Sequence, residues 1–541
     1  MTEPDTTVGV RENLEITRGR WQVIGAVILV VAAILRLYDL NLVPLHHDEG
    51  VNGSFLLKLV HDGIYKYDPQ NYHGPTLYYF AVVIPWILRL LFSISFADTY
   101  GLSVFSIRFV TAAFGVATVW LVLTLRRRIG RNSALAAAGL LAVSPGAVYL
   151  SRYFIHETLF VFFTLAAVAA AIRFYESARP MYLMLAAAAT ALLFATKETA
   201  MISVGVLLIA LASTAMFIKL REVLRNRSNA SRSNAKDEPM PEVVAASSAR
   251  FDGPSSLIIP AIAAVSLFLT IEILFYSSFF TNYPQGIYDA LKTFRIWAQT
   301  GKTVHVHPWS TYLSWMGQEE SPLLLLGLAG LGLALWRGAN RFAIFAGLWA
   351  FGLIVAYSLI PYKTPWLMAN FVVPLALISG YALGEIHERR KRPTVALAIA
   401  AAALGVSGYQ MLKLNFVHYD DSAYIYPYVH TKRDIFPMLE EIDLIAKRAA
   451  TGEETEIVVT SPEYWPLPWY LAKYPRVTYP QRISVFTAPI IIASSKQAEE
   501  FLTTNGARYE LTKSTMMNGG TYILRPGVEL MVFVRRDLAA R

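Results

Sequence analysis

The chain of 541 residues contains no cysteine. Disulfide bonds, thiolate catalysis and cysteine-ligated metals are therefore excluded. Charged residues are also scarce, because they make up 16% of the chain, whereas soluble domains contain about 25%. Hydrophobic residues make up 55%. This balance predicts a mainly α-helical, polytopic membrane protein.

The chain also lacks the features of a nucleic-acid or nucleotide partner. Its formal net charge of +9 would suit a nucleic-acid-binding protein, but the basic residues do not gather on a soluble segment. They lie in short clusters between apolar runs, which is typical of cytoplasmic loops. No Gly-rich loop followed by Lys and Ser or Thr is present, so a P-loop for nucleotide phosphates is excluded. The expected partner is the lipid bilayer, and no nucleic acid is expected.

The first apolar run, 21–38, is long enough to cross a bilayer. It follows a polar tail, 1–20, which we expect in the cytoplasm because it holds several arginines. No small-residue cleavage site follows the run, so we interpret it as a retained signal anchor. This orientation places the next polar residues, 46–49, on the outer face of the membrane.

The later apolar runs alternate from this start. We interpret the run 76–92 as a juxtamembrane helix in the outer interface, because its crossing would place the arginine cluster 126–131 outside. The remaining runs bring the total to about eleven transmembrane helices of roughly 20 residues in a domain spanning 21–414. They are 104–125, 133–150, 158–174, 181–196, 199–218, 255–280, 321–336, 342–359, 367–384 and 394–411.

Two segments differ from the apolar runs. The tract 219–253, rich in Arg, Ser, Asn and Pro, is predicted to be a disordered cytoplasmic loop. Residues 415–541 are predicted to form a small extracytoplasmic α/β domain. Its expected strands are 456–460, 489–493 and 530–534, and its expected helices are 434–448 and 495–503. The segment 461–470 interleaves aromatic residues with prolines, and it suits a sugar-stacking or lid surface and a rigid loop packed on the membrane domain equally well.

Ionisable residues gather on the outer face of this topology, where they are costly and usually functional. The candidate catalytic carboxylates are Asp48, Glu49 and Glu157. A carboxylate there can act as general base towards a hydroxyl, and cations can hold a phosphate leaving group. The candidate substrate-binding residues are Arg152, Lys197, Lys363, His47, His73, His305, His307, Trp309 and Tyr362. Together they predict transfer from a lipid-linked phosphosugar.

Each charged candidate also has a structural interpretation. Asp48 and Glu49 could cap the juxtamembrane helix and favour its N-terminus. Glu157 could be a carboxylate at the start of a helix. Lys197 and Lys363 could be snorkelling lysines at helix ends.

The histidines raise the question of a metal. Imidazole and carboxylate groups suit a divalent ion, so His46, His47, His73, His305 and His307 could form a metal cluster. No tight ligand spacing supports this interpretation, and hydrogen bonding or sugar contact is the favoured one. We therefore expect no metal ligands and no required cofactor, with a divalent cation left open.

Several motifs occur in a fixed order along the outer segments. They are His46-His47-Asp48-Glu49, His73-Gly74-Pro75-Thr76-Leu77-Tyr78, Phe105-Ser106-Ile107-Arg108, and Ser151-Arg152-Tyr153 with His156-Glu157. This set resembles the GT-C superfamily of membrane glycosyltransferases, which includes the protein O-mannosyltransferases and the lipid A aminoarabinose transferase. Ala195-Thr196-Lys197-Glu198-Thr199, His305 with His307-Pro308-Trp309, and Pro361-Tyr362-Lys363-Thr364-Pro365-Trp366 resemble more closely the archaeal-type flippase activity-associated proteins.

The resemblance implies a GT-C-like bundle and a transferase that uses a polyprenyl-phosphate sugar as donor. The acceptor would be a protein, a lipid or a glycan, and the active site would face outward from the plasma membrane. With Asp48 as the single general base, one displacement predicts inversion at the anomeric carbon. The alternative is a non-enzymatic flippase, or a flippase-associated protein, for lipid-linked oligosaccharides. A transporter should carry polar residues through the membrane midplane, whereas here they gather at one face, which favours the enzyme.

Overall fold

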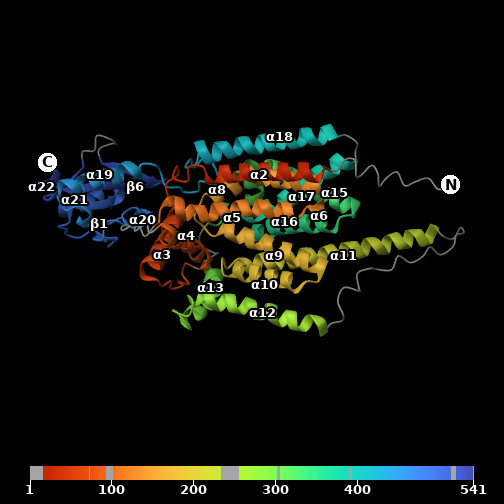
Figure 1. Cartoon of the computed structure of the whole chain (residues 1–541). Helices are drawn as coiled ribbons and strands as arrows, with labels where there is room; N and C mark the ends of the chain where they lie inside the picture. Colours follow the sequence, from red (N-terminus) through yellow and green to blue (C-terminus); the bar gives the residue numbers. More distant parts are fainter. Residues whose placement is uncertain are drawn as a thin grey trace.

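The computed structural model describes residues 16–71, 73–92, 102–232, 255–300, 305–389, 393–512 and 520–539. The chain forms an elongated bundle of helices with a small sheet at one end (Figure 1). The sheet comes from the C-terminal part of the chain and lies at the same end of the bundle as α3 and α4. The prediction of a mainly helical membrane protein with a small C-terminal α/β part is confirmed.

Every run predicted to cross the membrane is helical. These helices are α2 (Arg18–Leu37), α5 (Val104–Thr124), α7 (Arg131–Ala142) followed by α8 (Pro145–Ser151), α9 (Glu157–Ser177), α10 (Pro180–Phe194), α11 (Ala200–Arg232), α12 (Ser255–Tyr276), α15 (Ser321–Arg337), α16 (Arg341–Leu359), α17 (Ala369–Arg389) and α18 (Pro393–Leu412). Between them lie α3 (His47–Asp62), α4 (Thr76–Phe92), α6 (Arg126–Ile129), α13 (Gln285–Thr300), α14 (Thr311–Glu319) and the 3-10 turn η1 (Pro365–Met368). The π-helical turn η2 (Lys413–Val417) follows α18.

Helix length allows somewhat fewer crossings than the sequence predicted. Among the described residues, eight helices are long and apolar enough to cross a membrane, or up to ten if each bent pair is one span. α7 and α8 meet at 60°, where Pro145 breaks the hydrogen-bond ladder, and α14 and α15 meet at 112°. α10 has only 15 residues, short of the ~20 that a full crossing needs.

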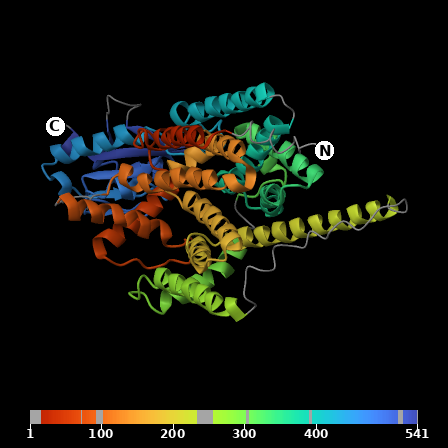
Figure 2. The same cartoon turned by 45° about the vertical axis from the view of Figure 1, so that its right-hand side comes forward.

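The segment after the α11 span differs from the prediction. α11 continues to Arg232 and projects beyond its neighbours (Figure 2), so the first part of 219–253 is helical and not disordered. Extending an existing helix needs no new nucleus, and the Leu, Arg and Glu residues that follow Lys219 favour helix. Residues 233–253 lie outside the described part of the chain.

α17 is the centre of the bundle. Every residue of its most apolar 18-residue stretch is buried, whereas only 6% of the corresponding stretch of α12 is buried, and α12 packs at the periphery against α10. Small residues allow the close packing around α17: Gly380 faces the backbone of Ser133 in α7, and Gly330 faces the Ile378 carbonyl, so a Cβ atom would collide at either glycine. This use of glycine is typical of helix packing in membranes.

The run interpreted as a juxtamembrane helix forms α4, beside α3 (Figure 1). Its apolar stretch, Thr76–Ile87, is shorter than a membrane span. This length suits a helix in the interface, but its orientation to a bilayer stays a prediction.

The C-terminal sheet has the strand order β2-β1-β3-β6-β4, and β5 pairs with β6. Its strands are β1 (Ile457–Val459), β2 (Val477–Thr478), β3 (Ile490–Ser494), β4 (Tyr509–Leu511), β5 (Thr521–Arg525) and β6 (Val528–Arg535). Its helices are α19 (Ile435–Arg448), α20 (Leu467–Tyr470), α21 (Ala498–Asn505) and α22 (Arg536–Ala539), with the 3-10 turns η3 (Gly452–Glu454) and η4 (Ser495–Gln497). β1 and β3 pair in parallel and are buried along their whole length, which explains their continuous apolar sequences. The three predicted strands correspond to β1, β3 and β6.

The segment 461–470 attaches the C-terminal part to α3. A Cβ atom added at Gly50 would lie 2.5 Å from the Pro466 Cβ atom, and one at Gly53 would lie 2.5 Å from the Trp469 ring. The Leu45 amide donates a hydrogen bond of 2.8 Å to the Tyr470 hydroxyl. Of the two interpretations of this segment, the structure therefore shows the packed loop.

Candidate active site

A cavity of about 650 Å³ lies between the first turns of α3, the loop that joins α10 to α11, and the segment that follows α16. It is the place where most of the predicted site residues meet. The predicted residues in its lining are His47, Asp48, His73, Glu157, Lys197, His305 and Tyr362. Other lining residues are Asn52, Gln70, Asn71, His156, Glu198, Thr199, Tyr357 and Trp366.

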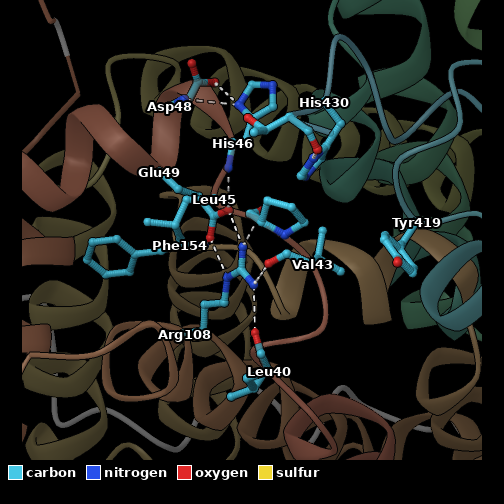
Figure 3. Close-up of polar contacts among 12 residues, drawn as sticks. Leu40, Val43, Leu45, His46, Asp48, Glu49, Arg108, Phe154, Tyr419 and His430 are labelled. Atoms are coloured by element: carbon cyan, nitrogen blue, oxygen red, sulfur yellow. Dashed lines mark hydrogen bonds and ion pairs between the residues drawn. The ribbon is translucent and has the colours of Figure 1, made fainter. Parts of the chain in front are cut away.

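Asp48 is placed by the N-terminus of α3. The Asp48 amide donates a hydrogen bond of 3.0 Å to His46 Nδ1 (Figure 3). His46 Nε2 lies 3.1 Å from the Tyr428 carbonyl. Because Nδ1 accepts, the ring proton of His46 lies on Nε2, and His46 is neutral. The Asp48 carboxylate is 41% exposed, and His46 Nδ1 lies 3.9 Å from it. Asp48 therefore presents an open carboxylate to the cavity.

Glu49 is in the opposite situation, although it is the next residue. It is fully buried, and Arg108 donates to it twice, from Nε to Oε1 at 2.7 Å and from NH2 to Oε2 at 2.6 Å (Figure 3). The Phe154 amide donates to Oε1 at 2.7 Å and the His46 amide to Oε2 at 3.0 Å. With both oxygens occupied, Glu49 has no group left for a substrate. The geometry does not support the predicted catalytic role and gives Glu49 a capping role.

Two ionisable pairs line another part of the cavity. Lys197 pairs with Glu157, the first residue of α9, and both side chains are buried. Burial lowers the pKa of Lys197, but Glu157 and Glu198 raise it more, so the net shift is upward and the ammonium group stays charged. His73 Nδ1 lies 3.1 Å from Glu198 Oε2, and His73 also forms a β-bridge with Lys197. Glu157 is thus both a helix-start carboxylate and a cavity residue.

His156 fills the space behind His73. The two rings lie 5.0 Å apart, and His156 Nε2 lies 2.9 Å from the Gly74 carbonyl. The ring proton is therefore on Nε2, and the buried Nδ1 atom has no hydrogen-bond partner among the described residues. Burial is the largest cause that lowers the pKa of His156, which keeps the ring neutral.

Two distant segments pair to bring His305 and Tyr362 to the cavity. The His307 amide donates to the Pro361 carbonyl at 3.1 Å, and the Lys363 amide donates to the His305 carbonyl at 2.9 Å. His305 Nδ1 also lies 3.0 Å from the Tyr428 hydroxyl. His307 instead packs against Trp315, and Trp309 is 69% exposed. Neither of these two predicted residues lines the cavity.

Arg152 and Lys363 do not line the cavity either. Arg152 donates to the carbonyls of Leu35, Tyr38 and Asp39, at the C-terminus of α2. Lys363 Nζ donates to the carbonyls of Ser358 and Ile360, at the C-terminus of α16. Both cations satisfy carbonyl groups that the helix ends leave unpaired. The geometry therefore does not support their predicted role in phosphate binding.

Some cavity residues were missed by sequence reasoning. Asn52 lies one helical turn after Asp48 in α3, so the two side chains share a face of the helix. Its amide donates to the Phe154 carbonyl at 3.0 Å and accepts from the Tyr78 hydroxyl at 2.9 Å. The spacing from Asp48 could have identified Asn52. Nothing local could have identified Tyr357, because it lies within a continuous apolar run.

The cavity holds no ready-made metal site in the part of the chain that the structure describes. No group of three or more histidine, aspartate and glutamate side chains is placed to hold a metal ion. Glu157 is paired with Lys197 and Glu198 with His73, so Asp48 is the carboxylate most open to a ligand.

Three comparisons relate the chain to known proteins. Residues 80–226, less than half of the chain, match the family described as dolichyl-phosphate-mannose-protein mannosyltransferase. No curated protein sequence matches the chain. Among solved structures, the chain is similar to ArnT from Cupriavidus metallidurans in the apo state, at 15% identity over 96% of this chain and 99% of that chain, with a TM-score of 0.57.

The same protein bound to undecaprenyl phosphate matches at 14% identity over 97% of this chain and 99% of that chain, with a TM-score of 0.59. The S. cerevisiae protein O-mannosyltransferase Pmt1-Pmt2 complex bound to the sugar donor matches at 18% identity over 53% and 36%, with a TM-score of 0.33. The last similarity is too small to show a shared fold. The two ArnT structures show that this chain shares the ArnT fold over nearly its whole length.

Proposed function

We propose that this protein is a membrane glycosyltransferase that moves a sugar from a polyprenyl-phosphate donor to an acceptor hydroxyl. The observation that carries the proposal is the open Asp48 carboxylate in a cavity that also holds the charged Lys197. The ArnT structure bound to undecaprenyl phosphate supports a lipid phosphate as the donor class. The neutral histidines around Asp48 leave its negative charge available for a proton.

In the proposed reaction Asp48 takes the proton of the acceptor hydroxyl while the oxygen attacks the anomeric carbon of the donor. The bond between that carbon and the phosphate oxygen breaks, and the polyprenyl phosphate leaves with the electron pair. Lys197 donates one hydrogen bond to Glu157, and an ammonium group has three donors, so it can also hold the phosphate. A single displacement inverts the configuration at the anomeric carbon.

The proposed reaction uses no cofactor and takes place at the outer face of the plasma membrane. The acceptor hydroxyl belongs to a protein, a lipid or a glycan. The donor tail stays in the bilayer while its head group reaches the cavity. The C-terminal α/β part is on the same outer side, because it packs on α3 next to Asp48.

The test is sugar transfer by the full chain in proteoliposomes that contain polyprenyl-phosphate sugars. Asp48→Asn should reduce transfer by about 10²–10⁴-fold, the usual contribution of a general base. Asp62→Asn is the matched control, because Asp62 is in the same helix, is exposed and should leave transfer unchanged. Unchanged transfer by Asp48→Asn would refute the assignment of Asp48 as the general base. Translocation of the lipid-linked sugar without any transfer would support the flippase instead.

A further inference from the structure

A cation of the C-terminal sheet reaches the cavity wall from a distant part of the sequence. Arg525, at the end of β5, lies with its NH1 atom 3.3 Å from His47 Nδ1. The same atom donates to the Trp465 carbonyl at 3.3 Å, and NH2 donates to Glu463 at 2.8 Å. Arg525 is 9% exposed, so its contact with His47 lies out of bulk solvent.

The approach of Arg525 to His47 is held by the packing of the C-terminal part on α3. Pro466 and Trp469 fit against Gly50 and Gly53, where no larger residue has room. His47, at the start of α3, is therefore held at a constant distance from β5. The glutamate partner and the Trp465 carbonyl set the plane of the guanidinium group, which has a rigid fork of donors.

This contact decides where the proton of His47 lies. A guanidinium group only donates hydrogen bonds, so a nitrogen that contacts it must accept. His47 Nδ1 is then unprotonated, and the single ring proton of the neutral imidazole lies on Nε2. No described residue pairs with Nε2, and His47 lines the cavity.

The charge of His47 agrees with this assignment. Burial is the largest cause that lowers the pKa of His47, to about 4, with Asp48 and Glu463 opposing it and His46 and Arg525 adding to it. The ring is therefore neutral at pH 7. A neutral ring beside Asp48 places no imidazolium charge next to the carboxylate.

We propose that Arg525 is a positioning residue that holds His47 in the Nε2-protonated form, so that His47 donates a hydrogen bond to an oxygen of the bound donor or acceptor. The proposal rests on the proposed function for the identity of the substrate. It also implies that the C-terminal part completes the active site and is not only attached to it.

The direct test is ¹⁵N NMR of the full chain labelled at histidine, which carries ten histidines. The His47 signals are assigned by their loss in His47→Gln. In the native protein the Nδ1 signal should be that of an unprotonated nitrogen and the Nε2 signal that of an N–H group. A protonated Nδ1 in the native protein would overturn the proposal, whether or not the protein transfers sugar.

The variants separate positioning from folding. Arg525→Met should give a mixture of the two tautomers and lower transfer roughly tenfold, as expected for one lost hydrogen bond to a charged group. Arg525→Lys should retain the native nitrogen signals and most of the transfer. Arg482→Met, at an exposed arginine of the same part of the chain, should change neither. Native His47 signals in Arg525→Met would refute the role of Arg525.

A complete absence of transfer by the native protein, with the expected His47 signals, would refute the proposed function and leave the tautomer assignment intact. Normal transfer with a protonated Nδ1 would support the proposed function and refute the tautomer assignment. The two proposals can therefore fail separately.

Discussion

Two parts of the cavity lining differ in whether their carboxylates have a partner. On the α3 wall the Asp48 carboxylate is 41% exposed, and the groups around it are neutral histidines. On the wall formed by α9 and the loop before α11, both carboxylates have partners, Lys197 for Glu157 and His73 for Glu198. The difference suits a site in which one wall takes a proton and the other holds a leaving group in place.

The largest expected effect is on stability, and it should distinguish the buried Glu49 carboxylate from the partly exposed Asp48 carboxylate. Arg108→Met would leave the Glu49 carboxylate buried without its cation, and breaking such a pair costs about 3–5 kcal/mol of stability. Asp48→Asn should cost much less stability, because Asp48 is partly exposed and has no close cation. Thermal unfolding in detergent measures both. Equal losses in the two variants would contradict the distinction between a capping and an open carboxylate.

The next largest effect is on binding of the lipid phosphate, and it should differ between Lys197 and Lys363. Lys197→Met should weaken binding of undecaprenyl phosphate by roughly 10–100-fold, because it removes a charged donor from the cavity. Lys363→Met should leave the affinity unchanged, because Lys363 donates to carbonyls at the end of α16. Binding to the purified protein is measured by titration. A larger loss in Lys363→Met would show that the phosphate binds elsewhere.

A smaller effect tests how the C-terminal part is attached to the α3 wall. Gly53→Ala would place a methyl group 2.5 Å from the Trp469 ring, and such overpacking costs about 1–3 kcal/mol. Gly332→Ala, in α15, has open space and should be neutral or slightly stabilising. Unfolding midpoints of the two variants give the comparison. A stable Gly53→Ala variant would mean that the C-terminal part is not pressed on α3.

The pH dependence of stability tests the neutral state of His47. Its folded pKa of about 4 lies below the value of about 6.5 expected for an unfolded histidine. The stability that the neutral ring contributes is therefore complete above about pH 6.5 and is lost as the pH falls from 6.5 towards 4. His47→Gln should flatten the stability curve in this window. An identical curve would indicate that other groups cause the dependence.

The smallest expected effect is that of metal removal. Because the described histidines and carboxylates form no group of three or more placed around one ion, chelation by EDTA should leave transfer unchanged. The control is re-addition of Mg²⁺ or Mn²⁺ to the treated protein. A loss of transfer that either ion restores would show that the cavity takes a metal with the substrate.

Much of the fold could be predicted because its signals are local. The apolar runs that became α2, α5, α9 and α16 carry their own evidence of helix and of membrane, since hydrophobicity over ~20 residues is sufficient to indicate a span. The breaks at α7–α8 and α14–α15 were less visible. A proline or a bend changes helix direction without changing the hydrophobicity of the run.

For the site, the sequence by itself determined the set of candidate acids, histidines and lysines, and the structure brings Asp48, Glu157 and Lys197 to one cavity. Only the tertiary structure decided which members are open. Asp48 and Glu49 are adjacent and chemically alike, yet Arg108 pairs with Glu49 and leaves the Asp48 carboxylate open to the cavity. Arg525 reaches His47 across 478 positions of sequence. A charged group takes its role from the partners that folding brings to it, and those partners lie too far along the chain for any local pattern to show.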